Sequence, residues 1–577
     1  MILLSTLALA DDVISAPPIV KYSSTAADEL ALDPVLPTQS AIGNNGTAQG
    51  SIQNPIFESL AYPISGTGSP GSVSSFRGLG RSSEDIDVQS LGIPLNGSQG
   101  GGFDLSSFPS FIWSDFHFQL GPSLNAFDPR GVSGALVLVP WTARALDEET
   151  SGYRATYLYS DVRLNQFSLG FRKPKEIAVL AGFSTGDSQG PAASLSGAWG
   201  HEAVHGSYHL LFTGLDAKSP GSASFPTPQE HLLTQRLIPV GEMEVKLPAN
   251  GLLKTTVFYD AQIIRDQDPT LSLDDRSYSQ QAGLENALLL GDWKIGVSGR
   301  EIVYRALSVN SQNEQTLNLQ LSKEFEWKNW LVEPTIQAIG VSRFGVFPGG
   351  SLGIKQTLMP SQLSAFARAT YSRRFPSLVD RFYNQSFFRG NADLIPEEDL
   401  TFNFGLDWEA SNFSVILQFF TQNRSHAQIN VTQNGVGTLL NLGSAEITSE
   451  LLTTVWKVSS WLSLSSDFTW SQSNLDATQQ PFPYLPSVLE IVGAHFYFPK
   501  KSYEINALSR FSAPVSYDLS GNLLPAYQNL DLSFIQPVGT HFRFQYRIEN
   551  VFDQHYQLIQ DFPVRGRAFS LLLSGEF

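Results

Sequence analysis

The amino-acid sequence predicts an all-β protein, a closed transmembrane barrel of about 22 antiparallel strands. Three observations point to this fold class: the alternating pattern of the last eleven residues, the return of long alternating segments after Trp141, and the length of that part of the chain. Successive side chains of a strand lie on opposite faces. A barrel wall that separates lipid from a polar lumen therefore requires such alternation.

The final segment, from Arg567 to Phe577, has the pattern expected of a closing barrel strand. One parity is apolar and comprises Phe569, Leu571, Leu573 and Phe577. The other parity comprises Ala568, Ser570, Ser574 and Glu576, with Leu572 as the one break in the pattern. An apolar outer face, a polar inner face and a terminal aromatic residue are typical of outer-membrane barrels. We therefore expect a bacterial outer-membrane location, contact with outer-membrane lipid, and recognition of the Phe577 strand by the barrel-assembly machinery.

Long alternating segments recur upstream, most clearly at His541 to Glu549 and at Thr401 to Glu409. Aromatic and aliphatic residues occupy one face of each segment, and polar or charged residues occupy the other. The polar face of the first segment carries two arginines and a glutamate, which is too polar for a soluble core and suits a barrel lumen. A β-propeller or a large sandwich would also contain many short strands. No repeat of about 40 residues supports a propeller.

Length and composition agree with a barrel. Residues 141–577, divided over 22 strands, allow about 20 residues for each strand with its loop, and a spanning strand takes about 9–11. The chain contains no run of 18 or more apolar residues, so the sequence predicts no transmembrane helix. Charged residues make up 16% of the chain, against about 25% in typical soluble domains. The net charge of −17 argues against a nucleic-acid partner, and the absence of cysteine excludes disulfides and thiolate chemistry.

The sequence divides into four parts. Residues 1–10 are an apolar run that ends in an A-x-A pattern, which predicts a signal-peptide cleavage site. Because this run is short and lacks basic residues, it is similar to the end of a longer signal peptide. A frayed N-terminus is the alternative interpretation. Residues 11–27 form an N-terminal segment, and residues 28–140 form a small mixed domain with many turns. Residues 141–577 form the barrel.

Three short motifs follow one another in the barrel part. The first is Arg374-Phe375-Pro376-Ser377-Leu378, and the second contains Gly390, Asn391, Pro396 and Glu397. The third contains Asn550, Phe552, Asp553 and Tyr556, followed by Gly566, Arg567 and the terminal Phe577. Together these motifs resemble the TonB-dependent outer-membrane receptors of the compact cobalamin and siderophore type. Their chemistry is that of turns and strand ends, so we expect architectural roles rather than ligand contact.

The N-terminal part resembles the plug domain of that family, an α+β domain inside the barrel lumen. The matching positions are Arg77, Gly78, Gly92, Gly121, Pro122, Gly131 and Gly134. In the family, charged plug residues attach the plug to the barrel wall. Here Ser114 to Phe118 lacks the arginine and glutamate of the matching stretch, and Leu91 replaces the aspartate of the turn before Gly92. The resemblance thus implies either weaker attachment or a different route to the same packing.

The segment after the predicted cleavage site is similar to a TonB box. It comprises Asp12, Val13, Ile14, Ser15 and Ala16. An extended segment of this kind can add a strand to the sheet edge of a partner protein. The resemblance implies that this partner is TonB with its inner-membrane energising complex, and that residues 11–27 lie in the periplasm. An ordinary disordered tail is the alternative interpretation of these positions.

The resemblance implies active import of a scarce, bulky nutrient, such as a ferric siderophore, cobalamin or a similar small-molecule chelate. Ligand would bind the extracellular loops and the plug apex, and both ligand and TonB would favour the same state of the plug. We find no catalytic constellation in the sequence and expect no cofactor and no resident metal. The alternative is a receptor, adhesin or structural component that does not transport, because a fold alone does not determine function.

Two further patterns have simpler interpretations. His201 to His205 reads H-E-x-x-H, a zinc-protease motif that requires a helix. Alternation from Trp199 to Phe212 instead predicts one strand, in which the two histidines are about 13 Å apart and share a face with His209. Histidines at that separation cannot bind one zinc ion. An acidic group suggests either a calcium-binding loop or an ordinary solvated loop, and comprises Asp266, Asp268, Asp274 and Asp275.

Overall fold

The computed structural model describes most of the barrel part and several pieces of the chain before it. The described residues before 151 are 38–42, 64–66, 74–76, 85–96, 102–104, 107–120 and 134–143. From 151 to 577 the gaps in the description are 162–163, 202, 219–226, 228, 249, 271–272, 308, 361, 385–387, 434–435, 499–501 and 565. No helix in the described part of the chain has both the length and the apolar character needed to cross a bilayer.

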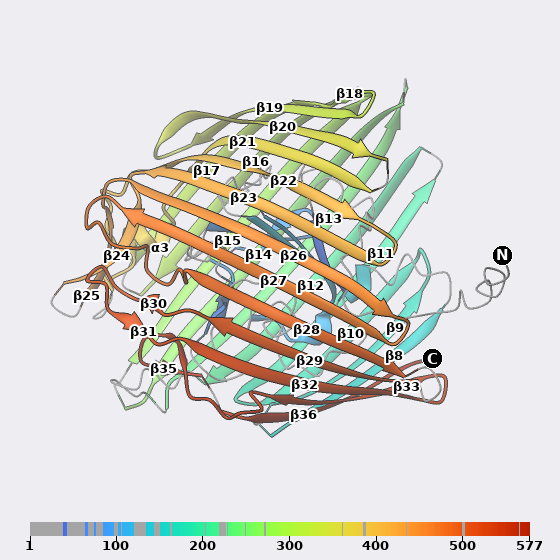
Figure 1. Ribbon diagram of the computed structural model, residues 1–577. Helices are drawn as coiled ribbons and strands as arrows, with labels where there is room; N and C mark the ends of the chain where they lie inside the picture. Colours follow the sequence, from blue (N-terminus) through green and yellow to red (C-terminus); the bar gives the residue numbers. More distant parts are fainter. Residues whose placement is uncertain are drawn as a thin grey trace.

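The chain from Gly152 onward forms a closed antiparallel barrel of 22 strands, as predicted (Figure 1). The first eleven are β8 (Gly152–Ser160), β9 (Leu164–Lys173), β10 (Ile177–Gly186), β11 (Ser188–His201), β12 (Val204–Lys218), β13 (His231–Leu247), β14 (Gly251–Asp268), β15 (Leu273–Leu290), β16 (Trp293–Ala306), β17 (Val309–Lys323) and β19 (Trp330–Val341). The others are β20 (Gly345–Met359), β21 (Leu363–Arg374), β22 (Glu397–Glu409), β23 (Phe413–Ser425), β26 (Ala445–Ser459), β27 (Leu462–Leu475), β28 (Val488–Phe498), β29 (Tyr503–Ser512), β32 (Tyr527–Val538), β33 (Phe542–Glu549) and β36 (Ala568–Glu576). The short strand β18 (Phe325–Trp327) extends the hairpin between β17 and β19.

The alternation read from the sequence separates the two faces of the wall. In β22, Phe402, Phe404 and Trp408 are between 40% and 49% exposed, whereas Thr401 and Asn403 are buried. An isolated barrel exposes its lipid-facing side chains, so these exposed residues mark the outer face. The wall closes where β36 pairs with β8. There Tyr153 and Phe577 exchange two backbone hydrogen bonds, each 2.9 Å from nitrogen to oxygen.

The two ends of the barrel differ in the length of their connections. One end, which we call the turn end, has mostly tight turns, such as Leu290 to Trp293 and Ser459 to Leu462. The other, the loop end, carries the longer connections and their small elements (Figure 1). These elements are α3 (Leu378–Phe382), β24 (Gln428–Gln433), β25 (Val436–Asn441), β30 (Val515–Ser516), β31 (Leu523–Leu524), β34 (Gln557–Ile559) and β35 (Phe562–Pro563).

The described residues between 38 and 143, which we call the inner segment, lie inside the barrel (Figure 1). Their five-stranded sheet has the order β1 (Thr38–Ile42), β6 (Trp113–Leu120), β7 (Gly134–Pro140), β4 (Ile86–Ser90) and β5 (Ile93–Pro94). The pairing of β4 with β7 is parallel, and the other pairings are antiparallel. A separate hairpin joins β2 (Ile64–Gly66) to β3 (Ser74–Phe76), and β2 lies beside β34.

A single apolar core joins the inner segment to the barrel wall. Ile86, Phe108 and Leu138 of the inner segment are fully buried, and Leu180 and Ile238 of the wall belong to the same cluster. Burial of apolar side chains on both sides stabilises the contact by about 25 cal/mol for each Å² removed from water. The inner segment is thus packed against the wall over a continuous apolar surface.

In the turn between β4 and β5, Leu91 has a strained backbone conformation but a buried side chain. Leu91 and Gly92 both have positive φ, at 54° and 72°. Hairpin turns of this kind favour Asn or Asp followed by Gly, because a branched aliphatic residue is strained there. The side chain of Leu91 is only 9% exposed and packs in the shared core, which offsets the strain. This burial accounts for the departure from the aspartate of the family pattern.

The prediction of one strand from Trp199 to Phe212 was wrong. A hairpin turn separates β11 from β12, and His201 pairs with Val204 at its tip. His201 therefore lies on the outer face, whereas His205 and His209 have the opposite parity on β12. Alternation alone did not reveal the turn, because a tight hairpin interrupts the pattern by only two residues.

Candidate functional site

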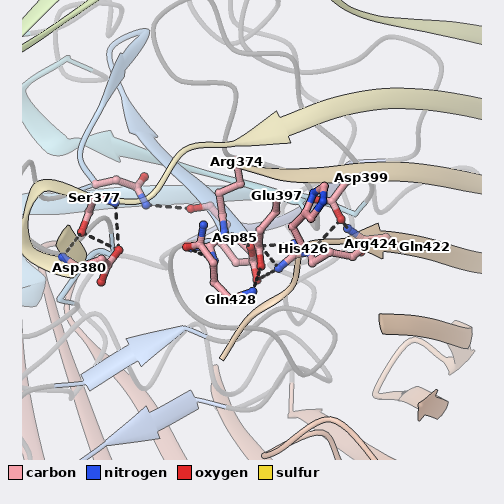
Figure 2. A network of polar contacts seen from close by, with 12 residues as sticks. Asp85, Arg374, Ser377, Asp380, Glu397, Asp399, Gln422, Arg424, His426 and Gln428 are labelled. Carbon is pink, nitrogen blue, oxygen red and sulfur yellow. Dashed lines mark hydrogen bonds and ion pairs between the residues drawn. The ribbon is translucent and has the colours of Figure 1, made fainter. Parts of the chain in front are cut away.

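A buried network of charged side chains connects the inner segment to the loop end of the barrel (Figure 2). Asp85, directly before β4, is the member from the inner segment. Two arginines and two carboxylates from the barrel wall surround it, and all five residues are at most 3% exposed. The barrel members are Arg374, Glu397, Asp399 and Arg424. We call this network the ionic contact.

Arg424 makes the largest number of these interactions. Its Nη2 donates to Asp85 Oδ1 at 3.0 Å, and its Nη1 lies 2.9 Å from Glu397 Oε2. Its Nε donates to Asp399 Oδ1 at 2.9 Å. An arginine presents donors in a planar fork, so one guanidinium can satisfy carboxylates from different chain segments. Arg424 on β23 thus joins the inner segment to β22.

Arg374 provides a second connection to the same aspartate. Its Nε lies 3.2 Å from Asp85 Oδ1 and also bonds the carboxylate of Glu397. Its Nη2 donates to Gln428 Oε1 at 3.2 Å. The backbone nitrogen of Gln428 in turn donates to Glu397. Because charges in a dry interior need several partners, this dense pairing is what makes their burial possible.

Two residues of the ionic contact stand at the two ends of one loop of the barrel. Arg374 is the last residue of β21, and Glu397 is the first residue of β22. The connection between them, residues 375–396, is the loop that contains α3. Both ends of this loop therefore contact Asp85 or its partners. A displacement of the loop ends would alter the charged surroundings of the inner segment directly.

The same loop is also anchored through α3 to wall strands beyond β19 and β20. A capping box starts the helix, since Ser377 Oγ accepts from Asp380 N at 3.1 Å and Asp380 Oδ2 accepts from Ser377 N at 3.0 Å. Leu378 packs in a cluster with residues of β16 and β17. Arg381 forms a buried ion pair with Glu314 of β17. The loop thus lies over the lumen mouth and bridges β15–β17 to β21–β23.

Tyr383, which ends α3, adds a further contact to this wall. Its hydroxyl donates to Asp275 Oδ2 at 2.8 Å. Burial, together with the hydrogen bond to Asp275, raises the pKa of the Tyr383 phenol above its usual range. The phenol therefore remains protonated and continues to donate.

A second polar contact involves a backbone carbonyl of the inner segment. Arg236 of β13 donates through Nη2 to the carbonyl of Leu95 at 2.8 Å. The same guanidinium forms a bidentate pair with Asp260 of β14, at 3.0 and 2.7 Å. Gln281 of β15 donates to the same carboxylate at 2.8 Å. Three neighbouring strands thus support one arginine that holds the end of the β4–β5 hairpin.

A third region of contact is almost free of charge, and we call it the packed contact. Phe111, in the 3-10 turn η3 (Ser110–Ile112), and Trp141 lie against wall glycines. A Cβ on Gly182 would be 2.6 Å from Cζ of Phe111, and a Cβ on Gly170 would be 2.9 Å from Cζ3 of Trp141. Only glycine permits so close an approach of a ring to the strand backbone.

Hydroxyl groups complete the packed contact. Thr142 Oγ1 lies 2.5 Å from Ser194 Oγ and accepts from Ser196 Oγ at 2.9 Å. Ser196 Oγ also lies 2.7 Å from Nδ1 of His209. The guanidinium of Arg154 lies 5.5 Å from the ring centroid of Trp141. The predicted barrel boundary at 141 therefore falls in residues that pack on the wall before β8 begins.

The barrel residues singled out from the sequence fall in three places. Gly390 and Asn391 lie against α3: a Cβ on Gly390 would be 2.7 Å from Phe382 N, and Asn391 N donates to the Asp380 carbonyl at 2.8 Å. Pro396 directly precedes β22, and Glu397 is in the ionic contact. The third group lies at the loop end of the barrel, and Phe577 lies at the turn end.

The third motif forms a turn at the loop end. Asn550 and Asp553 both have positive φ, and the Asp553 carboxylate accepts from Arg567 N at 2.7 Å. A Cβ on Gly566 would collide with that carboxylate. Tyr556 stacks on Tyr527 at 4.2 Å between ring centroids, whereas Phe552 is 63% exposed. At the turn end, Phe577 stacks on His541.

Several predicted residues lie outside the described part of the chain. These are the TonB-box residues Asp12, Val13, Ile14, Ser15 and Ala16, and the motif residues Arg77, Gly78, Gly121, Pro122 and Gly131. Gly92 and Gly134 are described: Gly92 lies in the β4–β5 turn, and Gly134 begins β7. A Cβ on Gly134 would be 2.7 Å from the carbonyl oxygen of Gln119, so the β6–β7 pairing requires glycine there.

Sequence reasoning missed Asp85, Asp399 and Arg424. The sequence does contain a pattern that could have indicated this network. Charged residues occupy inward-facing positions near the loop end of three consecutive strands, β21, β22 and β23. Buried charges need partners, so such a row predicts a network. The acidic group at Asp266 to Asp275 lies at the tip of the β14–β15 hairpin. Within the described residues, no set of three or more His, Asp or Glu side chains is placed to bind a metal ion.

Comparison with known proteins identifies the family. A family model described as TonB dependent receptor-like, beta-barrel matches residues 89–551. The chain belongs to the TonB-dependent receptors. A search of the curated proteins found no match. Accordingly, this receptor is a barrel of the outer membrane, and its family is one of transporters and receptors rather than enzymes.

Solved structures share the fold of this receptor at low sequence identity. The copper transporter OprC is 12% identical with a TM-score of 0.79, over 95% of this chain and 99% of that chain. The siderophore receptor PiuA from Acinetobacter baumannii is 13% identical with a TM-score of 0.78, over 97% and 99%. The FrpB iron transporter from Neisseria meningitidis is 11% identical with a TM-score of 0.77, over 92% and 97%. Short turns of such barrels face the periplasm, so the loop end of this receptor is extracellular.

Proposed function

We propose that this receptor imports a metal chelate across the outer membrane, with energy supplied through TonB. A ferric siderophore, cobalamin or a similar chelate is the class of cargo. Residues 28–140, which supply most of the inner segment, act as the plug. The observation that carries the proposal is the ionic contact. Arg374, at one end of an extracellular loop, pairs with Asp85 of the inner segment, and Glu397, at the other end, pairs with the arginines that hold Asp85.

The ionic contact supplies a physical route from ligand to plug. A ligand that contacts α3 or its loop shifts Arg374 and Glu397, which border that loop. Weaker pairing of Arg374 and Arg424 with Asp85 then leaves a buried carboxylate less well compensated, so the attached state of the plug loses stability. A ligand shifts the plug equilibrium only by its difference in affinity for the two states. TonB then needs to bind the same shifted state.

The extracellular surface beside α3 suits an anionic ligand that contains rings or a macrocycle. Arg343 lies 4.8 Å from the ring centroid of Phe382. Arg373 lies 4.4 Å from that of Phe347 and is paired with Glu398 at 2.6 Å. Arginine next to aromatic faces can bind both charge and flat apolar surface. Structural neighbours named as siderophore receptors and iron or copper transporters support the same class of cargo.

The periplasmic part of the proposal concerns Asp12, Val13, Ile14, Ser15 and Ala16. These residues would pair as an added strand with the C-terminal domain of TonB. The first experiment measures binding of that domain to the purified receptor, with and without residues 11–17. Binding that disappears on deletion supports energised transport.

Uptake assays test the transport step itself. Cells that express the receptor are given radiolabelled ferric siderophores of catecholate and hydroxamate type, and radiolabelled cobalamin, before and after collapse of the proton gradient. Uptake that stops on collapse supports the proposal. Surface binding without uptake, unchanged by the collapse, would instead favour the non-transporting receptor, adhesin or structural component.

A further inference from the structure

The β4–β5 hairpin of the inner segment departs from a regular antiparallel ladder at its open end. In a regular ladder, two residues that form a hydrogen-bonded pair exchange two backbone bonds. Leu95 N donates to the carbonyl of Val88 at 2.7 Å, which is the first bond of such a pair. The amide of Val88 donates instead to Oδ1 of Asn96, also at 2.7 Å. The carbonyl of Leu95 is thereby left for a donor from outside the hairpin.

That donor comes from the barrel wall. Nη2 of Arg236 lies 2.8 Å from the carbonyl oxygen of Leu95, and the bidentate pair with Asp260 fixes the direction of this guanidinium. A charged donor forms a stronger hydrogen bond than a neutral amide, so the exchange of Val88 for Arg236 ties the hairpin to β13. The side chain of Asn96 makes this exchange possible, because it satisfies the amide of Val88.

The same side chain also reaches the ionic contact. Nδ2 of Asn96 donates to the carbonyl of Ile86 at 2.9 Å, and Ile86 directly follows Asp85. Asn96, Ile86 and Leu95 are all buried. A buried amide or carbonyl that loses its partner is costly, so neither end of the hairpin can shift alone without a loss of hydrogen bonding.

The two wall contacts of the hairpin lie far apart along the barrel. Leu95 is bound by β13, whereas Asp85 is bound by residues of β21 and β23. The strands from β14 to β20 lie between these two regions of the wall. The hairpin therefore connects two parts of the wall that share no direct strand pairing.

We propose that Asn96 is a positioning residue that couples the ionic contact to the Arg236 contact. In this arrangement, withdrawal of Asp85 from its arginines also withdraws the Leu95 carbonyl from the wall, and the reverse holds because coupling is reciprocal. Without that side chain, the Val88 amide can return to the Leu95 carbonyl and compete with Arg236. The use of this coupling in ligand-driven release of the plug rests on the proposed function, whereas the coupling itself does not.

The test measures amide hydrogen exchange in the purified full-length receptor in detergent, without cargo. Arg424→Gln weakens the ionic contact, which the β4 amides report, and Arg236→Gln weakens the other contact, which the Leu95 amide reports. We expect each variant to speed exchange by about tenfold at its own end of the hairpin and by a similar factor at the other end, because the hairpin opens as one unit. In the Asn96→Ala background, the change at the other end should fall below about twofold.

The matched control is Asn403→Ala. Asn403 is also a buried asparagine, but its Oδ1 accepts from Nε2 of Gln418 within the wall, at 2.9 Å. Loss of this side chain should leave the effect of Arg424→Gln on the Leu95 amide unchanged within about twofold.

Three results would overturn the inference. If Arg424→Gln speeds exchange in β4 but not at Leu95 in the otherwise unaltered receptor, the two contacts are independent, and this comparison requires no Asn96 variant. If the effect at Leu95 persists in the Asn96→Ala background, another part of the inner segment carries the coupling. If Asn403→Ala abolishes the effect as fully as Asn96→Ala, general loss of stability explains it. Because exchange is measured without cargo, failed uptake in the transport assays would count against the proposed import and leave this inference standing.

Discussion

At Asp85 the inner segment meets the barrel wall through buried ion pairs, whereas at Phe111 and Trp141 it meets the wall through rings packed on glycine. The first contact depends on five charged side chains from four chain segments being in place together. The second depends on short-range packing against β9 and β10. Loss of one charged partner leaves the others buried and uncompensated. The ionic contact is therefore the one that a moving loop can weaken, while the packed contact keeps the inner segment in the lumen.

Removal of Arg424 tests the ionic contact most severely. Arg424→Ala leaves Asp85, Glu397 and Asp399 without their shared guanidinium, and we expect a loss of about 3–5 kcal/mol in local stability. Hydrogen exchange at the amides of β4 measures the local opening. The control Lys218→Ala breaks an exposed pair with Asp187 and should cost less than about 0.5 kcal/mol. Unchanged exchange in β4 would mean that the ionic contact does not stabilise the inner segment.

Overfilling the packed contact tests the other region. Gly182→Val places a branched side chain against Phe111 and against the carbonyl of Phe167, and we expect a cost of about 3 kcal/mol. The heat-modifiable folded fraction on a gel and hydrogen exchange around η3 report the effect. Gly299→Val is the matched control, because the nearest atom to its Cβ is 4.0 Å away. Equal damage from both variants would show that strand glycines are needed generally rather than at the packed contact.

Removal of the charge on Asp85 tests whether the ionic contact can be weakened without an effect on the packed contact. Asp85→Asn keeps a hydrogen-bond acceptor while Arg374 and Arg424 retain Glu397, so we expect about 2 kcal/mol of destabilisation at β4. In the double variant with Arg424→Ala, the two effects should fall short of additive, because both remove the same interaction. Additive effects in this double-mutant cycle would contradict a direct Asp85–Arg424 interaction. Exchange around η3 should stay unchanged throughout.

The smallest expected effect concerns the hydroxyl groups beside Trp141. Thr142→Val keeps the shape of the side chain but removes its bonds with Ser194 and Ser196, at a cost of about 1 kcal/mol. A shift in the thermal unfolding midpoint of the detergent-solubilised receptor measures this loss. A cost as large as that of Gly182→Val would mean that hydrogen bonding, and not ring packing, dominates the packed contact.

The sequence predicted those features of the fold that depend on neighbouring residues. Alternation in Thr401 to Glu409 identified both faces of β22, and the turn chemistry of Asn550 and Asp553 matches their positive φ. Alternation failed at His201, because a two-residue turn leaves the period almost intact. The alternation of apolar and polar residues also does not identify the partner of Asp85, because Arg424 is 339 residues away in the sequence. Pairing of charges so far apart in the sequence depends on which distant segments meet in the fold, and alternation within one strand carries no information on that.

The unequal length of the strands has a consequence for how other macromolecules approach the cell surface. β14 and β15 contain 18 residues each, whereas β33 contains 8. A difference of ten residues corresponds to about 25 Å of height, so β14–β15 forms a ridge of hydrogen-bonded sheet. On the low side, the rim consists of hairpins such as β30–β31 and β34–β35, which have few backbone pairs to break. We expect an antibody against the ridge to contact an extended sheet edge, whereas an antibody against the low hairpins would contact segments with few backbone pairs to break.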